Sequence, residues 1–313
     1  MTTDRSTGAT LAADEVRSAV RDRYAAAART TLGLLDGAPR AESSGSCCAP
    51  TCCSSEAGHG SAAAVGGAAV VPVGADPITR DLYEPDEAPS SGALLASLGC
   101  GNPTLLAALE PGQDVLDLGS GGGLDVLLSA RRVAPGGTAY GVDMTPEMLE
   151  LARRNQAEAG IENARFLLGA IEAVPLPDAS VDVVISNCVI NLAADKDPVL
   201  AEAFRVLRPG GRFAVSDIVL LRPIPEPLVG VVGLWTGCVS GALLNSDYVA
   251  KLTAAGFADA SVEVTRRYDR ADLEELAESL RPDELPDGFD LDATLAALEG
   301  AFASAAVRAG KPA

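Results

Sequence analysis

The chain has 313 residues, 48% of them hydrophobic, so it can bury a core and form one large domain or two smaller ones. Its 43 acidic against 24 basic residues give a net charge of −19, which disfavours nucleic acid and anionic membrane surfaces as partners. A single histidine, His59, leaves almost no material for a histidine metal site or a Ser-His-Asp triad.

The location of the protein is predicted from its apolar runs and its cysteines. No apolar run reaches the roughly 20 residues that span a bilayer, and the first residues carry no secretory pattern. Seven cysteines, an odd number, fit a reducing compartment with working thiols better than a disulfide framework. We therefore expect a cytoplasmic protein without a membrane partner.

Residues 1–74 are predicted to form a helix followed by a flexible segment. Val16, Val20 and Tyr24 recur at helical spacing within residues 13–30. Glycine, serine, alanine and proline dominate residues 37–74, as is typical of a linker. This segment carries two pairs of cysteines: Cys47, Cys48, Cys52 and Cys53.

Residues 75–220 are predicted to form the main domain, in which strands alternate with helices. We expect strands over 114–118, 138–143, 164–168, 181–186 and 212–217. Helices are expected over 93–98, 103–109, 124–133, 146–159 and 198–207, the last closed by a turn at Arg208-Pro209-Gly210-Gly211. Such alternation favours a parallel α/β sheet with helices on both faces.

Residues 221–313 are predicted to form a smaller α+β region. A proline-rich break at 222–227 precedes an apolar segment, 228–244, which is either a substrate lid or an interface, and Cys238 within it favours the lid. A helix over 247–255, a strand over 260–267 and an acidic helical tail from Asp269 should follow.

A glycine-rich loop follows the first strand of the main domain: Asp117-Leu118-Gly119-Ser120-Gly121-Gly122-Gly123. Glycine is needed where backbone approaches a ligand closely. The dinucleotide fingerprint requires its third glycine where this chain has Leu124, so NAD and FAD are disfavoured. Asp143 ends the next strand, where a carboxylate can accept both ribose hydroxyls. A tight turn alone would explain the glycines but not Asp143.

This loop resembles motif I of class I S-adenosylmethionine (AdoMet) methyltransferases. The segment Gly169 to Pro177 looks like the one that lays an apolar and a polar residue against adenine in these enzymes. The resemblance implies AdoMet as cofactor, bound by the following residues: Asp117, Gly119, Ser120, Gly121, Gly123, Asp143, Met144, Ile171, Glu172 and Asn187. It also implies a Rossmann-like, seven-stranded, mostly parallel sheet.

Three isolated cysteines sit beside glycine or at a strand end: Cys100, Cys188 and Cys238. Cys188 follows the strand over 181–186, so its thiol should point into the cleft where open α/β sheets bind ligands. From the residues alone, the three are either buried small hydrophobes or a shared thiol site.

The segments around these cysteines look like the three cysteine motifs of arsenite methyltransferases, a likeness that covers roughly residues 75–265. The resemblance implies that Cys100, Cys188 and Cys238 bind trivalent arsenic as thiolates, and arsenic is soft enough to prefer sulfur. It further implies methylation of arsenite to mono- and dimethylated products, with cellular thiols as reductant. We expect a monomer.

Members of that family carry a further upstream cysteine that relays arsenic or forms a disulfide. Cys47, Cys48, Cys52 and Cys53 are candidates for such a relay, and a linker without that role is an equal alternative. Two other functions stay open. One is a small-molecule C- or O-methyltransferase with incidental cysteines, for which Asp217 is the acidic side chain to inspect. The other is a non-catalytic metalloid-binding protein.

Overall fold

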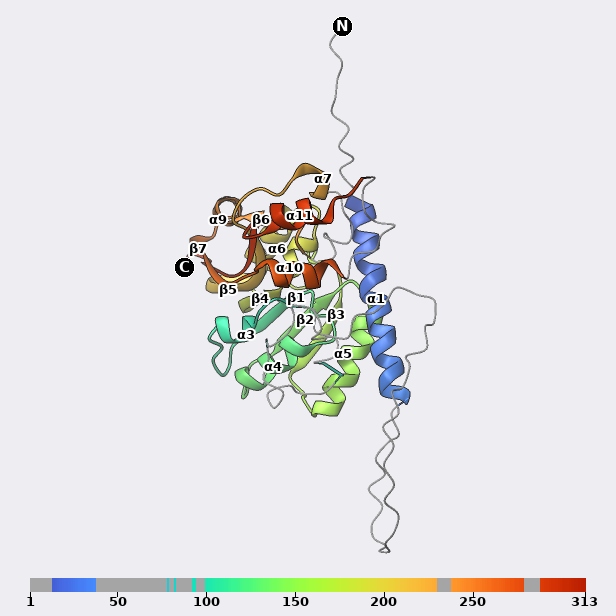
Figure 1. Cartoon of the computed structure of the whole chain (residues 1–313). Coiled ribbons are helices and arrows are strands. Elements are labelled where there is room, and N and C mark those ends of the chain that lie inside the picture. The colour runs from blue at the N-terminus through green and yellow to red at the C-terminus, as the bar shows by residue number, and fades with distance from the viewer. Residues whose placement is uncertain are drawn as a thin grey trace, which may run out of the picture.

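The computed structural model describes residues 13–37, 78, 82, 92–93, 99–229, 238–278 and 288–313 (Figure 1). The four cysteines at 47–53 lie outside these ranges, as does most of the helix expected over 93–98. Among the helices of the described residues, none is both long enough and apolar enough to cross a membrane.

One sheet organises the described residues. Its strands are β1 (Val115–Leu118), β2 (Ala139–Asp143), β3 (Ala164–Leu168), β4 (Val181–Asn187), β5 (Leu207–Leu220), β6 (Leu243–Leu244), β7 (Ala258–Arg267) and β8 (Phe302–Gly310). The order across the sheet is β3-β2-β1-β4-β5-β8-β7, and β6 pairs with β5. Strands β1 to β5 are parallel, whereas β8 runs antiparallel to both β5 and β7.

The predicted Rossmann-like, mostly parallel sheet is therefore confirmed, with one correction. The described sheet has eight strands rather than seven. The additional strand is β6, a two-residue pairing with the far end of β5, which is too short to carry a periodic signal in the sequence.

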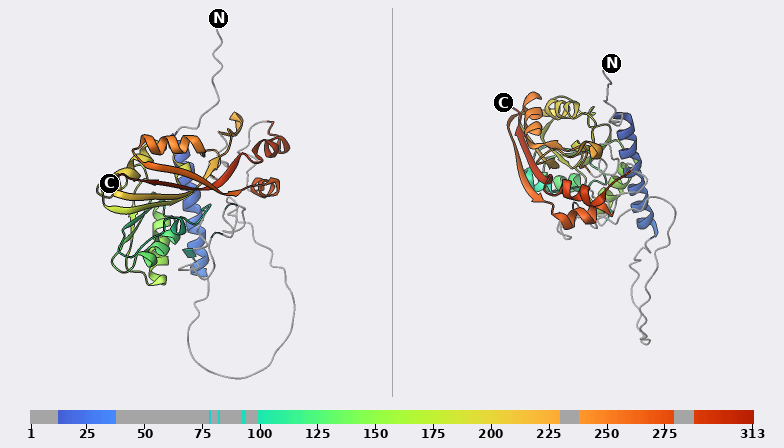
Figure 2. Two further views of the ribbon diagram at one scale, coloured as in Figure 1. Left: turned by 90° about the vertical axis from the view of Figure 1, so that its left-hand side faces the viewer. Right: turned by 45° about the horizontal axis from the view of Figure 1, so that its top comes forward.

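Helices cover both faces of the sheet (Figure 2). Successive side chains of a strand point to opposite faces. Leu116 and Leu118 of β1 therefore share a core with α6 (Asp197–Val206) and α9 (Asn245–Ala254). Val115, on the opposite face, shares a second core with the end of α4 (Leu124–Val133). Helices α3 (Pro103–Leu106) and α5 (Pro146–Ala159) contact α4.

Helix α1 (Ala13–Gly37) packs beside α5 along the edge of the domain (Figure 1). The helix extends beyond the predicted residues 13–30. Residue Thr31 continues the helical turns, and its hydroxyl donates a hydrogen bond to the carbonyl of Ala27. Val16 and Val20 on its inner face are buried, so apolar contact anchors the helix.

The predicted turn at Arg208–Gly211 lies inside β5. The register between β4 and β5 shifts between Val181 and Val183, so the turn residues form an irregularity within the strand rather than its start. Gly210 has a φ of +77°, which suits glycine there.

The expected helical tail is corrected at its end, where β8 lies between β5 and β7. Alanine is depleted in strands, and the alanine-rich run of β8 does not read as one from sequence. Hydrogen bonding on both edges and burial of Phe302 to Val307 override that preference. Strands β7 and β8, with the short β6, thus complete the sheet whose strands β1 to β5 come from 75–220, while the lid role of 221–313 stays a prediction.

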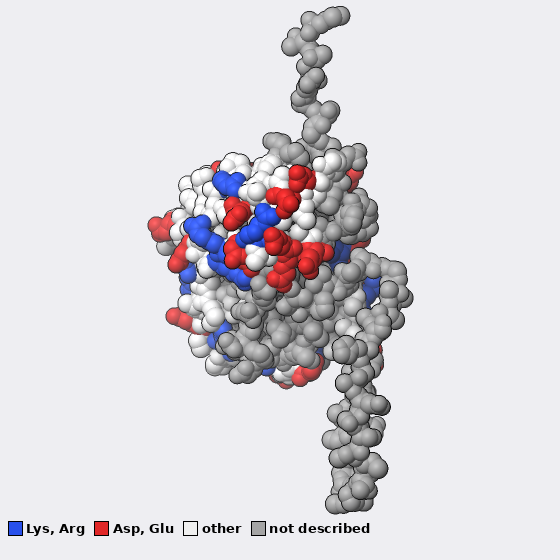
Figure 3. Space-filling view, viewed as in Figure 1, with Lys and Arg blue, Asp and Glu red and all other residues white. Residues whose placement is uncertain are grey.

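The remaining described elements are the 3₁₀ turn η1 (Ile190–Leu192), α7 (Glu226–Val229), α10 (Arg270–Ala277) and α11 (Leu291–Leu298). On the face shown in Figure 3, acidic and basic side chains of α10 and α11 are interspersed. Arg270 pairs there with Glu274 and Asp292, each at 2.8 Å. These exposed pairs contribute little to stability and suit a solvated surface.

Candidate active site

The glycine-rich loop connects β1 to α4 and is held against the end of β2. The backbone N–H groups of Gly119 and Ser120 both donate to the carbonyl of Val142, at 2.8 and 3.0 Å. Gly121 has a φ of +49°, and a side chain added there would meet open space. Glycine is therefore required by the backbone conformation, and it leaves the loop bare toward the cavity beside it.

Asp143 ties the loop to β2. Its carboxylate accepts the backbone N–H of Gly121 at 2.9 Å and that of Thr145 at 2.8 Å. Burial raises the pKa of Asp143, and these hydrogen bonds act in the opposite direction. Each carboxylate oxygen has two lone pairs, so acceptor capacity remains for a ligand such as a ribose.

A cavity of about 210 Å³ opens beside Asp143. Five residues predicted to bind the cofactor line it: Gly119, Asp143, Met144, Ile171 and Glu172. Residues of α1 form its other wall, with Arg17 bonded to Glu172 at 3.3 Å. A smaller cavity of about 50 Å³ follows on the loop side. It is lined by Asp117, Ser120, Gly121 and Asn187 among others.

Buried polar atoms at the smaller cavity lack partners. Among the described residues, Asp117 Oδ1 and the Ser120 hydroxyl have no hydrogen-bond partner. Burial raises the pKa of Asp117, and the neighbouring Asp125 and Asp143 raise it further. Buried polar groups are normally hydrogen-bonded. These two atoms therefore suit the polar methionine end of an AdoMet molecule, and Asp143 with Ile171 and Glu172 suits its nucleoside end.

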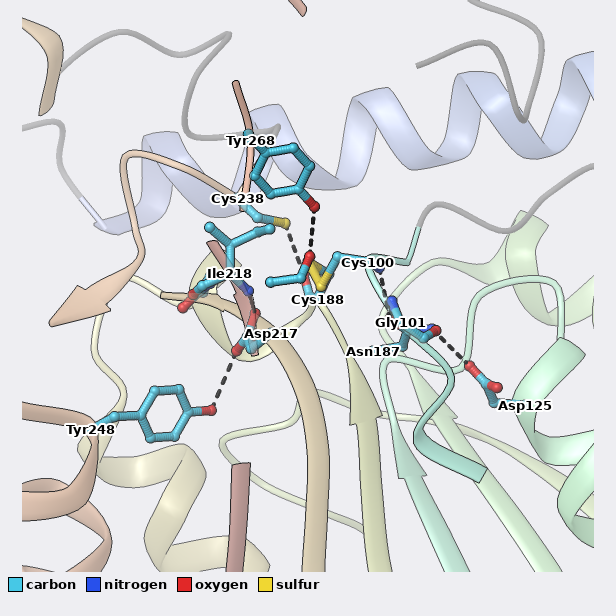
Figure 4. The surroundings of a disulfide bond; sticks show 12 residues. Cys100, Gly101, Asp125, Asn187, Cys188, Asp217, Ile218, Cys238, Tyr248 and Tyr268 are labelled. Atoms are coloured by element: carbon cyan, nitrogen blue, oxygen red, sulfur yellow. Dashed lines mark hydrogen bonds between the residues drawn. A yellow bond between two sulfur atoms is a disulfide. The ribbon is translucent and has the colours of Figure 1, made fainter. Parts of the chain in front are cut away.

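The structure brings the three isolated cysteines together at the carboxyl ends of β4 and β5 (Figure 4). Cys100 and Cys188 form a disulfide, with their Cα atoms 5.8 Å apart. The Cys238 thiol donates to the carbonyl of Cys188 at 2.9 Å. All three are buried. The sequence predicts thiols at all three positions, and the structure corrects this for the first two, whose sulfurs are close enough to bond.

Asn187 holds Cys100 beside Cys188. Its side-chain oxygen accepts the backbone N–H groups of Cys100 and Gly101, at 2.8 and 3.2 Å. Its amide nitrogen donates to the carbonyl of Gly101 at 2.7 Å and to Asp125 at 3.2 Å (Figure 4). Asn187 was predicted to bind the cofactor. It does line the smaller cavity, but its described bonds clamp the Cys100 loop.

Two of the cysteines occupy an unusual backbone conformation. Cys188 has a φ of +60° and Cys238 a φ of +67°. Residues with a side chain seldom adopt this left-handed region, and such conformations cluster at functional sites. Since glycine would relieve the crowding at either position, cysteine there points to a use for the thiol.

Asp217 lies next to the disulfide. One of its carboxylate oxygens and the sulfurs of Cys100 and Cys188 all lie within 4.8 Å of one another. Tyr248 donates to Asp217 at 3.3 Å (Figure 4). Burial raises the pKa of Asp217 to about 7, although Lys196 acts to lower it. The sequence singled out Asp217 by its place at a strand end, without any sign that it would sit beside the thiols.

The sequence did not identify Tyr24 as a site residue. It belongs to α1, far from the loop along the chain, and yet it lines both cavities. Its helical spacing with Val16 and Val20 showed that it faces inward, but no local pattern indicates what a packed helix will cover.

The sheet order, the glycine-rich loop and the adjoining cavities are those of the class I AdoMet-dependent methyltransferase fold. Residues 109–256 match the family model of a methyltransferase domain. The solved structure of an arsenic(III) S-adenosylmethionine methyltransferase from Chlamydomonas reinhardtii is 36% identical, with a TM-score of 0.53, and the match covers 68% of each chain. A phosphoethanolamine N-methyltransferase of Haemonchus contortus is 18% identical, with a TM-score of 0.52 over 69% of this chain and 54% of that one. It shares the fold.

Curated relatives narrow the class. An arsenite methyltransferase of Halobacterium salinarum is 43% identical over 246 residues, which are 78% of this chain and 58% of the relative. The human arsenite methyltransferase is 36% identical over 152 residues, which are 46% of this chain and 40% of the relative. The chain belongs to the arsenite methyltransferase family. It spans about half the length of the curated relatives that it matches.

Proposed function

We propose that this protein methylates trivalent arsenic, held by Cys100, Cys188 and Cys238, with AdoMet as methyl donor. The observation that carries the proposal is the convergence of these residues: two sulfurs are in bonding contact, and the third thiol lies on the Cys188 carbonyl. Three cysteines gathered in one buried cluster supply the ligand type that a soft trivalent ion prefers.

Binding of arsenite requires the disulfide to be opened. Two equivalents of a small thiol, or one reduced thioredoxin-type protein, convert the Cys100–Cys188 disulfide into two thiols and leave as the oxidised disulfide. Each thiol then replaces one hydroxyl of arsenite with release of water. Asn187 keeps Cys100 near Cys188 while the bond is open, because its contacts are to the backbone of the Cys100 loop.

The arsenic lone pair is the nucleophile in this proposal, so no general base is needed. AdoMet, when bound, supplies an electrophilic methyl group. The chain's own contribution is to bind the two reactants in adjoining sites and to exclude water from the buried thiols, and such positioning can supply much of a rate enhancement. Methyl transfer places the arsenic lone pair in the new arsenic–carbon bond, so thiols must reduce the pentavalent product by two electrons, with formation of a disulfide, before a second methyl is added. Mono- and dimethylated arsenicals are the proposed products.

We also propose a reductant, a cellular location and an oligomeric state for this protein. The Cys100–Cys188 disulfide, which must open before arsenic binds, supports thiol reductants as partners, and the odd number of cysteines supports a reducing, cytoplasmic location. We propose a monomer. Cys47, Cys48, Cys52 and Cys53 stay candidates for capturing arsenic before transfer, which a variant with all four changed to serine tests directly.

The principal test incubates the purified protein with arsenite, AdoMet and a thiol, and measures methylated arsenicals by chromatography with mass spectrometry. The wild type should form them, and the single variants Cys100→Ser, Cys188→Ser and Cys238→Ser should form almost none. Circular dichroism of each serine variant controls for loss of folding, and the fourfold serine variant of the 47–53 cysteines is assayed beside them as the separate test of arsenic capture. Methylation at the wild-type rate by Cys188→Ser would overturn the proposal.

A further inference from the structure

Helix α1 forms part of the cofactor cavity although it precedes the main domain. Arg17, Val20 and Tyr24 line the larger cavity opposite Asp143 and Met144. Ion pairs attach the helix to the domain: Arg17 to Glu172 at 3.3 Å, Arg29 to Glu147 at 2.6 Å and Arg154 to Asp36 at 2.6 Å. Since such exposed pairs hold weakly, buried Val16 and Val20 supply most of the attachment.

Tyr24 stands where the two cavities meet. It lines both of them, and it shares that position with Gly119 and Val189. AdoMet has the same layout, since its sulfonium sulfur joins the nucleoside half to the methionine half. A donor with its nucleoside near Asp143 and its methionine end near Asp117 therefore carries its positive sulfur past this junction.

Besides lining the two cavities, Tyr24 also lies against the cysteines. Its side chain packs against the core cluster that contains Cys100, Cys188 and Cys238. Burial raises the pKa of the Tyr24 hydroxyl, and the negative charges of Cys238 and Asp143 raise it further. The side chain is half-buried, with its hydroxyl in the deep part, so it stays a neutral phenol between the arsenic site and the cofactor loop.

We propose that the ring of Tyr24 faces the sulfonium of the methyl donor and makes the site prefer the charged donor over the spent one. The inference rests on the proposed function for the identity of the donor. An aromatic face attracts a cation, and desolvation strengthens the attraction. Methyl transfer breaks the sulfur–methyl bond and leaves its electron pair on sulfur. S-adenosylhomocysteine is therefore a neutral thioether, which the ring does not hold in this way.

Tyr24 is thus a positioning residue on α1, and α1 is part of the active site rather than an appendage. The prediction concerns a ratio of two affinities. Loss of the ring should weaken AdoMet binding roughly three- to tenfold more than S-adenosylhomocysteine binding. Phenylalanine keeps the ring and should keep the ratio.

The test is calorimetric titration of the wild type, Tyr24→Phe and Tyr24→Leu with each ligand, in the absence of arsenite. Arg29→Gln is the matched control, because it loosens α1 by removing the Glu147 pair without touching the cavity. It should leave the ratio unchanged even if both affinities fall. Circular dichroism confirms that every variant is folded.

Three outcomes overturn the inference. In the first, Tyr24→Leu binds both ligands as tightly as the wild type does. In the second, it weakens both affinities by the same factor, as loss of stacking on adenine would. A loss of preference in Tyr24→Phe would assign the role to the hydroxyl. These measurements do not involve arsenic, so failure of arsenite methylation in the wild type is a separate result.

Discussion

Cys238 offers a quantitative test of why a cysteine occupies a left-handed backbone position. Its φ is +67°, a conformation that costs a residue with a Cβ about 1–2 kcal/mol relative to glycine. Cys238→Ala keeps this strain and loses the thiol. Cys238→Gly loses the thiol and relieves the strain, so comparing the two variants isolates the backbone term.

Two effects oppose the relief of backbone strain in the glycine variant. Glycine lacks the buried methyl of alanine, which is worth about 0.8 kcal/mol. The greater conformational entropy of glycine in the unfolded state lowers the stability of the folded state by about 0.5–1 kcal/mol. Together they offset the relieved strain, so the two Cys238 variants should be of nearly equal stability. Cys100 is also buried and has no positive φ. At Cys100 the free energy of unfolding of the alanine variant should therefore be about 1–2 kcal/mol larger than that of the glycine variant.

The assay is urea unfolding of the four variants under reducing conditions, followed by circular dichroism. With a slope of about 3 kcal/mol per M, the alanine–glycine difference in midpoint should be about 0.3–0.7 M at Cys100 and close to zero at Cys238. Equal differences at the two positions would refute the reasoning. A side chain at position 238 would then not strain the backbone, and the presence of cysteine there would need no functional explanation.

Other predictions follow from the site. Asp143→Asn should weaken AdoMet binding roughly tenfold by calorimetry, because an amide offers one acceptor oxygen where the carboxylate offers two; an unchanged affinity would remove the ribose role. Asn187→Ala should slow closure of the Cys100–Cys188 disulfide severalfold in a thiol-trapping time course, since it frees the Cys100 loop; wild-type kinetics would count against the clamp. Burial raises the pKa of Asp217 from 3.8 to about 7, so between these values the folded state holds a proton that the unfolded state has lost, and the contribution of Asp217 to stability falls as pH rises through this window. Asp217→Asn should therefore gain stability relative to the wild type from pH 4 to 7 in urea titrations; a constant difference would contradict the raised pKa.

The parts of the fold that the sequence predicts well are those coded locally. The bounds of α4, α5 and β3 are confirmed as expected, because their signals are local: the apolar pattern of each element, the N-terminal proline of α5, and a glycine next to each element. The loop from Gly119 to Gly123 and the acidic end of β2 are likewise adjacent to the strands that place them.

Other features depend on partners distant in sequence. Strand β8 is a strand because β5 and β7 bond it on both edges, and its alanine-rich composition says nothing of that. Tyr24 enters the cofactor cavity because α1 packs beside α5. Asp217 meets the thiols because β5 lies next to β4. Motif spacing fixes which residues are chemically suited, and tertiary packing decides which of them meet.

The position of β8 has a consequence for how this protein is made. Among the described strands it comes last along the chain, and yet it lies between β5 and β7. During synthesis, β5 and β7 therefore emerge from the ribosome before β8, the strand that joins them, has been made. Until residue 310 emerges, two strand edges stand open to pairing with other chains. Yield in the cell should then depend on chaperone capacity late in translation.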